Sequence, residues 1–511
     1  MKFDLCHVRD KKSIEKFNTQ YKEMTGTDFG SVQPKSTNTK VNDKWVDLAK
    51  DDTLLKYSIP PLKTMLFQVL KEKYLMDRKP ILKILNQLPL DILAEFLQSC
   101  SQDQTPVGLE IIQLLWEKNE DFSIVSWESV LDATYKHDLF FRDSYIYGIS
   151  QNMLYPMYND QFAINVYQNY SLFKVRSVQP ENWENLVMLP KERVHELPVF
   201  PGDHSIVDKE TFLEAFHRET NGLFKSLKEW PEGMVIHGGL ITKCLLGATE
   251  NIKGFESSDV DISFIDTCKT GILQGKVDMN FFYQLFGDSK TIQEKYSIVF
   301  DKSGYILTQH YPHKHYQFNF NVYLSIEEIL LGCDIDSSMF LFNGTDVFTL
   351  KRGLMSMNSR LNFATAQNSW IRNTNVYVKR LLKYAKRGFN IYINNDEYKR
   401  YMDNHTIEKV LLSDNLEGLS YLYSCVRLIS TNPALSETLM NTKSLVPYGE
   451  DWTKSKFDAY VGKNYQENYD GYNNGDWPAI VEIDHLGFSY FDRDTSEQAI
   501  AKSKINQWFD E

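Results

Sequence analysis

The stretch from Val235 to Asp266 constrains the fold more than any other part of the chain. A short apolar strand leads into Gly238 and Gly239, and an apolar stripe at helical spacing follows the two glycines. Asp259 and Asp261 then lie at alternate positions of a second apolar strand. Side chains alternate between the two faces of a strand, so both carboxylates point the same way. The order predicts a strand, turn, helix and strand with an acidic edge.

Two adjacent carboxylates repel each other unless a proton or a cation neutralises them. Mg²⁺ is usually held by one or two carboxylates together with the phosphates of a substrate. Gly238 and Gly239 would let the backbone approach such a phosphate closely. We therefore expect Asp259 and Asp261 to bind Mg²⁺ or Mn²⁺, and the two glycines to shape a phosphate-binding turn.

This arrangement resembles the core motif of the nucleotidyltransferase superfamily, the DNA polymerase β-like fold. In that family a Gly-Gly or Gly-Ser turn precedes a strand with an Asp-x-Asp or Asp-x-Glu pair. The resemblance implies an α/β (α+β) fold, with a nucleotidyltransferase-like mixed sheet flanked by helical domains. Nineteen residues lie between Gly239 and Asp259, which is long for the family, and an insertion around Glu250–Ser258 would account for the length.

A downstream segment strengthens the resemblance. Over about residues 235–392 the chain is similar to a poorly characterised branch of nucleotidyltransferase-like proteins in large DNA viruses and some eukaryotes. The similarity rests on an Asp-x-Asp step, a Gly turn and a basic helix that ends in Lys-Tyr-Ala-x-Arg-Gly-Phe. The matching residues are Asp334, Asp336, Gly344, Arg352, Arg380, Lys383, Tyr384, Ala385, Arg387, Gly388 and Phe389.

The third carboxylate of the superfamily is missing from its expected strand. The alternating strand Tyr316–Leu324 carries Gln317, Asn319 and Asn321 at its polar positions. Asp334 and Asp336 would supply a catalytic carboxylate if they lay beside the first pair. Alternatively, these two aspartates start a strand, cap a turn or pair with a basic residue.

Basic residues after the core strands are candidates for phosphate contact. Lys351, Arg352 and Arg372 follow those strands directly. The helix around residues 379–387 also carries several cations, which would bind a triphosphate or an RNA backbone. The alternative is a solvated helix face whose cations lie near a C-terminus closed by Gly388.

Composition narrows the class of protein. The chain has 511 residues, a formal net charge of −12 and six cysteines without a C-x-x-C pair. The charge argues against a broadly basic surface that coats nucleic acid. Isolated cysteines indicate a reducing compartment. The sequence shows no apolar run of membrane-spanning length and no secretory h-region. We expect a cytoplasmic protein without membrane contact, or a viral protein of the cytosol.

Pattern changes along the chain predict six regions. They are a polar N-terminal segment (1–50), a helical domain (51–140), a connecting region (141–205), the nucleotidyltransferase-like core (206–350), a helical C-terminal domain (351–440) and an acidic aromatic tail (441–511).

Together these features favour an enzyme that binds ATP or another nucleoside triphosphate and transfers a nucleotidyl group to a hydroxyl. The size and multi-domain layout favour a polymer acceptor, and we expect an RNA 3′ end, as in poly(A) tailing, with single-stranded RNA as a partner. The alternative is a catalytically inactive fold that serves as a structural or binding module. A toxin-like enzyme that modifies protein hydroxyls is a third option. The sequence does not indicate an oligomeric state.

Overall fold

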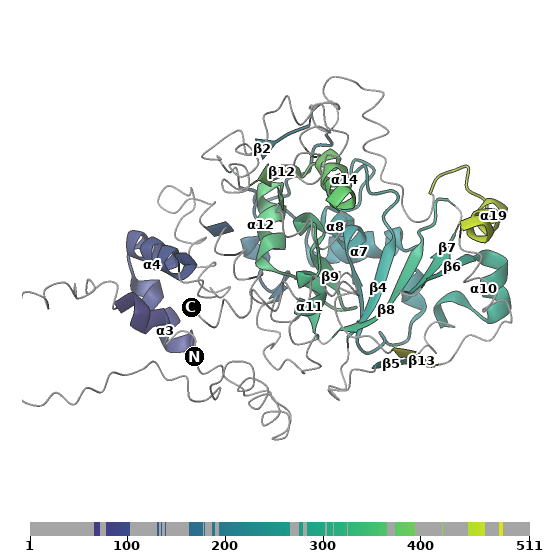
Figure 1. The fold of residues 1–511 in the computed structure, drawn as a ribbon, viewed down its shortest axis with the longest axis horizontal. Helices are drawn as coiled ribbons and strands as arrows, with labels where there is room; N and C mark the ends of the chain where they lie inside the picture. Colours follow the sequence, from purple (N-terminus) through teal and green to yellow (C-terminus); the bar gives the residue numbers. More distant parts are fainter. Residues whose placement is uncertain are drawn as a thin grey trace, which may run out of the picture. The chain divides into compact units, whose positions relative to one another are not determined.

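A computed structural model gives the fold (Figure 1). It describes residues 66–71, 78–102, 163–176, 186–189, 194–265, 275–278, 284–301, 304–309, 311–323, 325–364, 374–393, 448–464 and 480–483, with single positions at 130, 131, 134, 138, 178 and 422. The chain divides into two compact units, one mainly within Met1–Phe140 and the other mainly within Asp160–Phe509. Within these described segments, no helix is both long and apolar enough to cross a bilayer.

The smaller unit contains the helices α3 (Arg78–Gln87) and α4 (Leu90–Gln102). Ile81 and Leu85 of α3 are buried, as are Leu93 and Phe96 of α4. Their positions at helical spacing confirm the helices that the sequence predicts here.

The larger unit is built on an eight-stranded mixed sheet, with the order β1-β10-β9-β3-β4-β8-β7-β6. The strands are β1 (Ile164–Asn165), β3 (Met234–His237), β4 (Val260–Ile265), β6 (Ser297–Asp301), β7 (Gly304–Thr308), β8 (Tyr316–Tyr323), β9 (Phe340–Phe342) and β10 (Val347–Thr349). Within this sheet β4 and β8 run parallel, and the other neighbours run antiparallel. A mixed sheet with flanking helices confirms the predicted α+β class.

Two short sheets complete the described strands. β11 (Leu361–Ala364), β12 (Asn390–Ile393) and β2 (Leu186–Val187) form one of them. β13 (Ile480–Ile483) pairs antiparallel with β5 (Gly275–Asp278) in the other.

Local sequence explains the strands around the predicted acidic edge. The polar, Gly-containing run from Asp301 to Gly304 predicts a hairpin between strands at 297–300 and 305–309, and β6 and β7 do pair Asp301 with Gly304. β8 has the period-2 alternation of YQFNFNVY, and Phe318 from this strand is fully buried. These two elements are confirmed to within one residue at each end.

Helices cover the sheet and border its acidic edge. The α-helices given for the described part of this unit are α7 (Lys209–Glu219), α8 (Gly239–Leu245), α10 (Ser289–Lys295), α11 (Ile326–Leu331), α12 (Lys351–Ser359), α14 (Thr374–Lys386) and α19 (Lys454–Asn464). α7 begins where the Asp208 carboxylate accepts a hydrogen bond from the Thr211 amide at 2.8 Å. α8 packs on α7 and lies against β3 and β9, while α14 lies against β11 and β12 (Figure 1). Phe212 and Phe216 of α7 pack on Phe342 of β9 in the core between helices and sheet.

Candidate functional site

Asp259 and Asp261 flank Val260 at the start of β4. In the register of the sheet, Asp261 lies between His237 of β3 and Gln317 of β8. The structure brings the predicted turn to this carboxylate. Gly238 has φ +88°, and a Cβ atom there would lie 3.0 Å from an Asp261 carboxylate oxygen. Glycine at 238 thus adopts the positive φ without strain, and the absence of a Cβ atom leaves the space that the Asp261 side chain occupies.

Gly239 serves a different contact. A Cβ atom at 239 would lie 2.8 Å from the Tyr384 hydroxyl, 3.2 Å from Ser258 Oγ and 3.4 Å from an Arg387 Nη atom. The missing side chain therefore lets α14 and the residue before Asp259 pack closely against the first turn of α8. The Gly-Gly pair joins β3, β4 and α14 at one point.

Burial and charge act against each other at the aspartate pair. Burial raises the pKa of Asp259 above the ordinary carboxyl range, and the neighbouring Asp261 raises it further. The positive charges of Lys383, Lys314 and Arg387 oppose this rise. The pKa of Asp259 is raised on balance, so a cation that enters between the two carboxylates would relieve both desolvation and repulsion.

The basic helix provides Lys383, which opposes the rise most strongly of these cations. Burial lowers the pKa of the Lys383 ammonium, and Arg387 and Arg380 lower it further, while Asp259 and Asp261 raise it. Lys383 is half-buried, and its charge interacts with those of both carboxylates. A phosphate group beside Lys383 would supply the negative charge that this cluster of cations favours.

The donor set fits Mg²⁺ or Mn²⁺ only in part. Among the residues that the structure describes, no group of three or more His, Cys, Asp or Glu side chains is placed to hold a metal ion. Asp259 and Asp261 would therefore supply two carboxylates, and phosphates or waters would supply the other ligands. Mg²⁺ binds in this way in many phosphate-handling sites.

Neutral side chains fill the sheet beside Asp261. Gln317 on β8 is aligned with Asp261, and its amide donates to the Asn319 carbonyl oxygen at 3.3 Å. The Asn319 amide in turn donates to Ser263 Oγ at 3.2 Å, and His237 Nε2 lies 2.9 Å from the same hydroxyl. The described side chains of β8 thus place amides where the sequence resemblance leads one to look for a third carboxylate.

Asp334 and Asp336 form ion pairs instead of extending the Asp259–Asp261 pair. Asp334 accepts from Arg380 Nε at 2.8 Å and from Arg380 Nη2 at 3.0 Å, a bidentate pair that ties η7 (Asp336–Ser338) and its preceding residues to α14. Asp336 accepts from Arg352 Nη1 at 2.6 Å and from the Phe363 amide at 2.8 Å. Of the two roles that the sequence left open, the structure places both aspartates in the ion-pair arrangement.

The predicted phosphate contacts have mixed outcomes. Lys351 and Arg352 begin α12 and are 1% and 3% exposed, with Arg352 bound to Asp336. Buried at that level, neither side chain is presented to a phosphate in solution. Arg372 lies outside the described residues.

Three long cationic side chains hold the segment between α8 and β4. Arg218 donates to the carbonyls of Gly247 and Ala248 at 2.9 and 2.8 Å. Arg387 donates from Nε to the Gly254 carbonyl at 2.7 Å and from Nη2 to Ser258 Oγ at 3.1 Å. Its guanidinium also lies over the rings of Phe255 and Tyr384, 4.0 and 4.5 Å from their centroids. The long spacing between Gly239 and Asp259 thus corresponds to an ordered loop.

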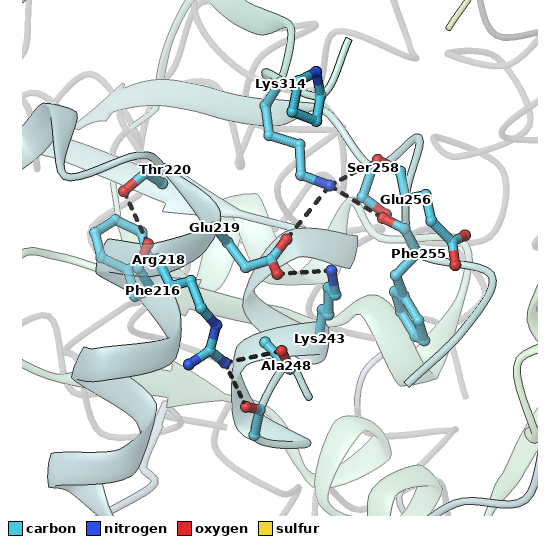
Figure 2. Close-up of polar contacts among 12 residues, drawn as sticks. Phe216, Arg218, Glu219, Thr220, Lys243, Ala248, Phe255, Glu256, Ser258 and Lys314 are labelled. Carbon is cyan, nitrogen blue, oxygen red and sulfur yellow. Dashed lines mark hydrogen bonds and ion pairs between the residues drawn. The ribbon is translucent and has the colours of Figure 1, made fainter. Parts of the chain in front are cut away.

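Lys314 is the third of these cations, and the sequence reading missed it. Its ammonium donates to the carbonyls of Phe255 and Glu256 at 3.2 and 2.7 Å, and lies 3.5 Å from a Glu219 carboxylate oxygen (Figure 2). Lys243 binds the other oxygen of Glu219 at 2.7 Å. The only sequence signal for this network was the unusual length of the Gly-to-Asp spacing, which requires that something fix the added loop.

Comparison with known proteins corrects the family assignment. A family model described as Gad2, Gabija anti-defense 2 family protein, matches residues 207–360, less than a third of the chain. The assignment to the nucleotidyltransferase superfamily, and to its branch in large DNA viruses and some eukaryotes, was wrong, because the matching family is a different one. A Gly-Gly turn and an Asp-x-Asp pair involve few residues, and motifs of that length also match unrelated families. No curated protein and no solved structure matches the chain.

Proposed function

We propose that the larger unit binds a nucleoside triphosphate through a divalent cation at Asp259 and Asp261, and transfers its nucleotidyl group to a hydroxyl acceptor. The proposal rests on the local chemistry and not on a family assignment. The observation that carries it is the aspartate pair itself: two carboxylates on one strand face, one with its pKa raised by burial, beside Lys383 and Arg387.

Each residue of the site would have a separate role in such a reaction. Asp259 and Asp261 would hold Mg²⁺ or Mn²⁺, which when bound supplies charge stabilisation at the phosphates. Gly238 keeps the space over Asp261 open, and Lys383 would contact a phosphate oxygen. Without a carboxylate on the described part of β8, an acceptor hydroxyl would lose its proton to water or to the aspartate pair.

An RNA 3′ end is the acceptor that we would test first, with single-stranded RNA as the partner. The isolated cysteines favour a cytoplasmic setting for the reaction. The description of the matching family adds a biological role: we infer that the chain acts as an anti-defense protein against Gabija, with the aspartate site as the part that acts.

The test incubates the purified chain with Mg²⁺ or Mn²⁺, each labelled nucleoside triphosphate in turn, and a short single-stranded RNA. The double variant Asp259→Asn/Asp261→Asn keeps side-chain size and removes both charges, so it should abolish transfer while the fold is retained. Asp346→Asn is the matched control, because Asp346 is a carboxylate of the same unit in an ion pair with Lys209 at 2.9 Å. Transfer that survives in the double variant would disprove the assignment.

A second function has specific support. Asp334 and Asp336 are bound to Arg380 and Arg352, and amides occupy the described face of β8, so the site has fewer carboxylates than a two-metal enzyme uses. These observations favour a binding module that holds a nucleotide or a protein without turning it over. Metal-dependent nucleotide binding without transfer to RNA, small acceptors or protein would select this alternative.

A further inference from the structure

Lys314 lies at the junction between the loop that precedes Asp259 and the strand that neighbours it. Val260 is aligned with Tyr316 in the parallel ladder of β4 and β8, and the Val260 amide donates to the His315 carbonyl at 2.8 Å. Lys314 therefore lies just before β8, where the same register brings it level with Ser258, the residue before Asp259. Its side chain is 6% exposed, so its ammonium is bound by protein groups and not by solvent.

The Lys314 ammonium links the loop before Asp259 to the end of α7. The carbonyls of Phe255 and Glu256 belong to the loop that ends at Asp259, four and three residues before the aspartate. Glu219 is the last residue of α7. Figure 2 shows the ammonium between the Glu219 carboxylate on one side and the Phe255–Glu256 backbone on the other. Lys314 thus fixes the loop at the point where the chain turns into β4.

We propose that Lys314 is a positioning residue for the aspartate pair. By binding two successive loop carbonyls, it fixes the position of the Asp259 carboxylate relative to that of Asp261. A cation shared by two carboxylates needs their oxygens within a few tenths of an ångström of the right separation. This inference rests on the proposed function in one respect, namely that Asp259 and Asp261 bind a divalent cation.

Lys243 provides a matched control within the same network. It is also buried, at 9% exposure, and binds the same Glu219 carboxylate at the shorter distance of 2.7 Å. Among the described residues its ammonium donates to Glu219 and not to the loop carbonyls. Loss of Lys243 therefore removes a buried charge from Glu219, as loss of Lys314 does, but it leaves the hold on Phe255 and Glu256 in place.

The experiment measures Mn²⁺ binding to the full chain by electron paramagnetic resonance, with urea unfolding of the same samples. Lys314→Met should weaken Mn²⁺ binding by about 10- to 100-fold, the range typical for residues that orient metal ligands. Lys243→Met should change Mn²⁺ affinity by less than about threefold, although both variants lose stability. Lys314→Arg, whose guanidinium also donates to carbonyls, should recover most of the affinity.

Hydrogen exchange of the metal-free protein separates this inference from the proposed function. Lys314→Met should speed amide exchange across residues 252–258, and Lys243→Met should leave it near the wild-type rate. Equal exchange in the two variants, or equal loss of Mn²⁺ affinity, would overturn the positioning role. If the wild type itself binds no Mn²⁺, the proposed cation site fails, and exchange alone still decides whether Lys314 fixes the loop. If Lys314→Met does not fold, Lys314→Gln is measured in its place, with a loss in the same direction.

Discussion

Replacing Asp336 by asparagine distinguishes a structural carboxylate from a catalytic one. Asp336 is 1% exposed and binds Arg352, itself 3% exposed, at 2.6 Å, while its other oxygen accepts the Phe363 amide at 2.8 Å. Breaking a buried ion pair by removing one partner costs about 3 to 5 kcal/mol. Asparagine keeps an acceptor for the Phe363 amide, so Asp336→Asn should cost an amount in that range.

Asp336→Ala should cost about 1 to 3 kcal/mol more, because the buried Phe363 amide then loses its acceptor as well. The free energy of unfolding is measured by urea denaturation of the full chain, followed by circular dichroism. In a double-mutant cycle, Asp336→Asn with Arg352→Met should cost less than the sum of the two single changes. Each single variant leaves one buried charge without its partner, whereas the double variant removes both charges. Mn²⁺ affinity of the folded protein should be unchanged.

The opposite pattern would refute this reasoning. If Asp336→Asn were within about 1 kcal/mol of wild-type stability and lost Mn²⁺ binding, Asp336 would belong to the metal site. The sequence prediction of a catalytic Asp336 would then stand, and the ion pair would be incidental.

Three further changes test other parts of the site. A change from glycine to alanine normally stabilises a helix by up to about 1 kcal/mol. For Gly239→Ala we expect instead a loss of stability of about 1 to 3 kcal/mol, because the new Cβ atom would lie 2.8 Å from the Tyr384 hydroxyl. A melting temperature at or above that of the wild type, or no partial recovery with Tyr384→Phe, would contradict this. Burial raises the pKa of Asp259, so protons compete with Mn²⁺ for this carboxylate at pH values above the ordinary carboxyl range. The Mn²⁺ affinity should therefore fall as the pH is lowered from about 8 to 6, by up to about tenfold per pH unit once the pH is below that pKa. A constant Kd across this interval would argue against Asp259 as a metal ligand. Glu219→Gln removes the carboxylate that the buried ammoniums of Lys243 and Lys314 share. It should lower the free energy of unfolding by about 3 to 5 kcal/mol, and by more than Lys243→Met does. Urea midpoints in the reverse order would show that the network is not organised around Glu219.

Local patterns predicted the elements of the larger unit well. The β6–β7 hairpin, the alternating strand β8 and the helix α14 each depend on signals within a few residues: a Gly-containing turn, a period of two and a period of 3.6. The strand, turn, helix and strand that the sequence predicts return β4 beside β3, and this brings Gly238 close to Asp261.

The rest of the site depends on contacts between distant parts of the sequence. Lys314 follows Phe255 by 59 positions, and Arg387 follows Gly254 by 133. A lysine before a strand carries no local mark of its partners, so composition and periodicity did not single out Lys314. Asp334 and Asp336 illustrate the same limit. An Asp-x-Asp step has the same appearance whether it binds a cation from solution or two arginines from α12 and α14.

The hydrogen bond from Arg387 to the Gly254 carbonyl limits how far the chain can be shortened from its C-terminal side. The family match ends at residue 360, before α14 begins at Thr374. A fragment trimmed to the matched span would keep both aspartates but lose the guanidinium that binds Gly254 and Ser258. Its Gly239 would also face an open space where Tyr384 packs. Any excised or grafted form of this unit should therefore run at least to Ile393, the end of the strand that follows α14.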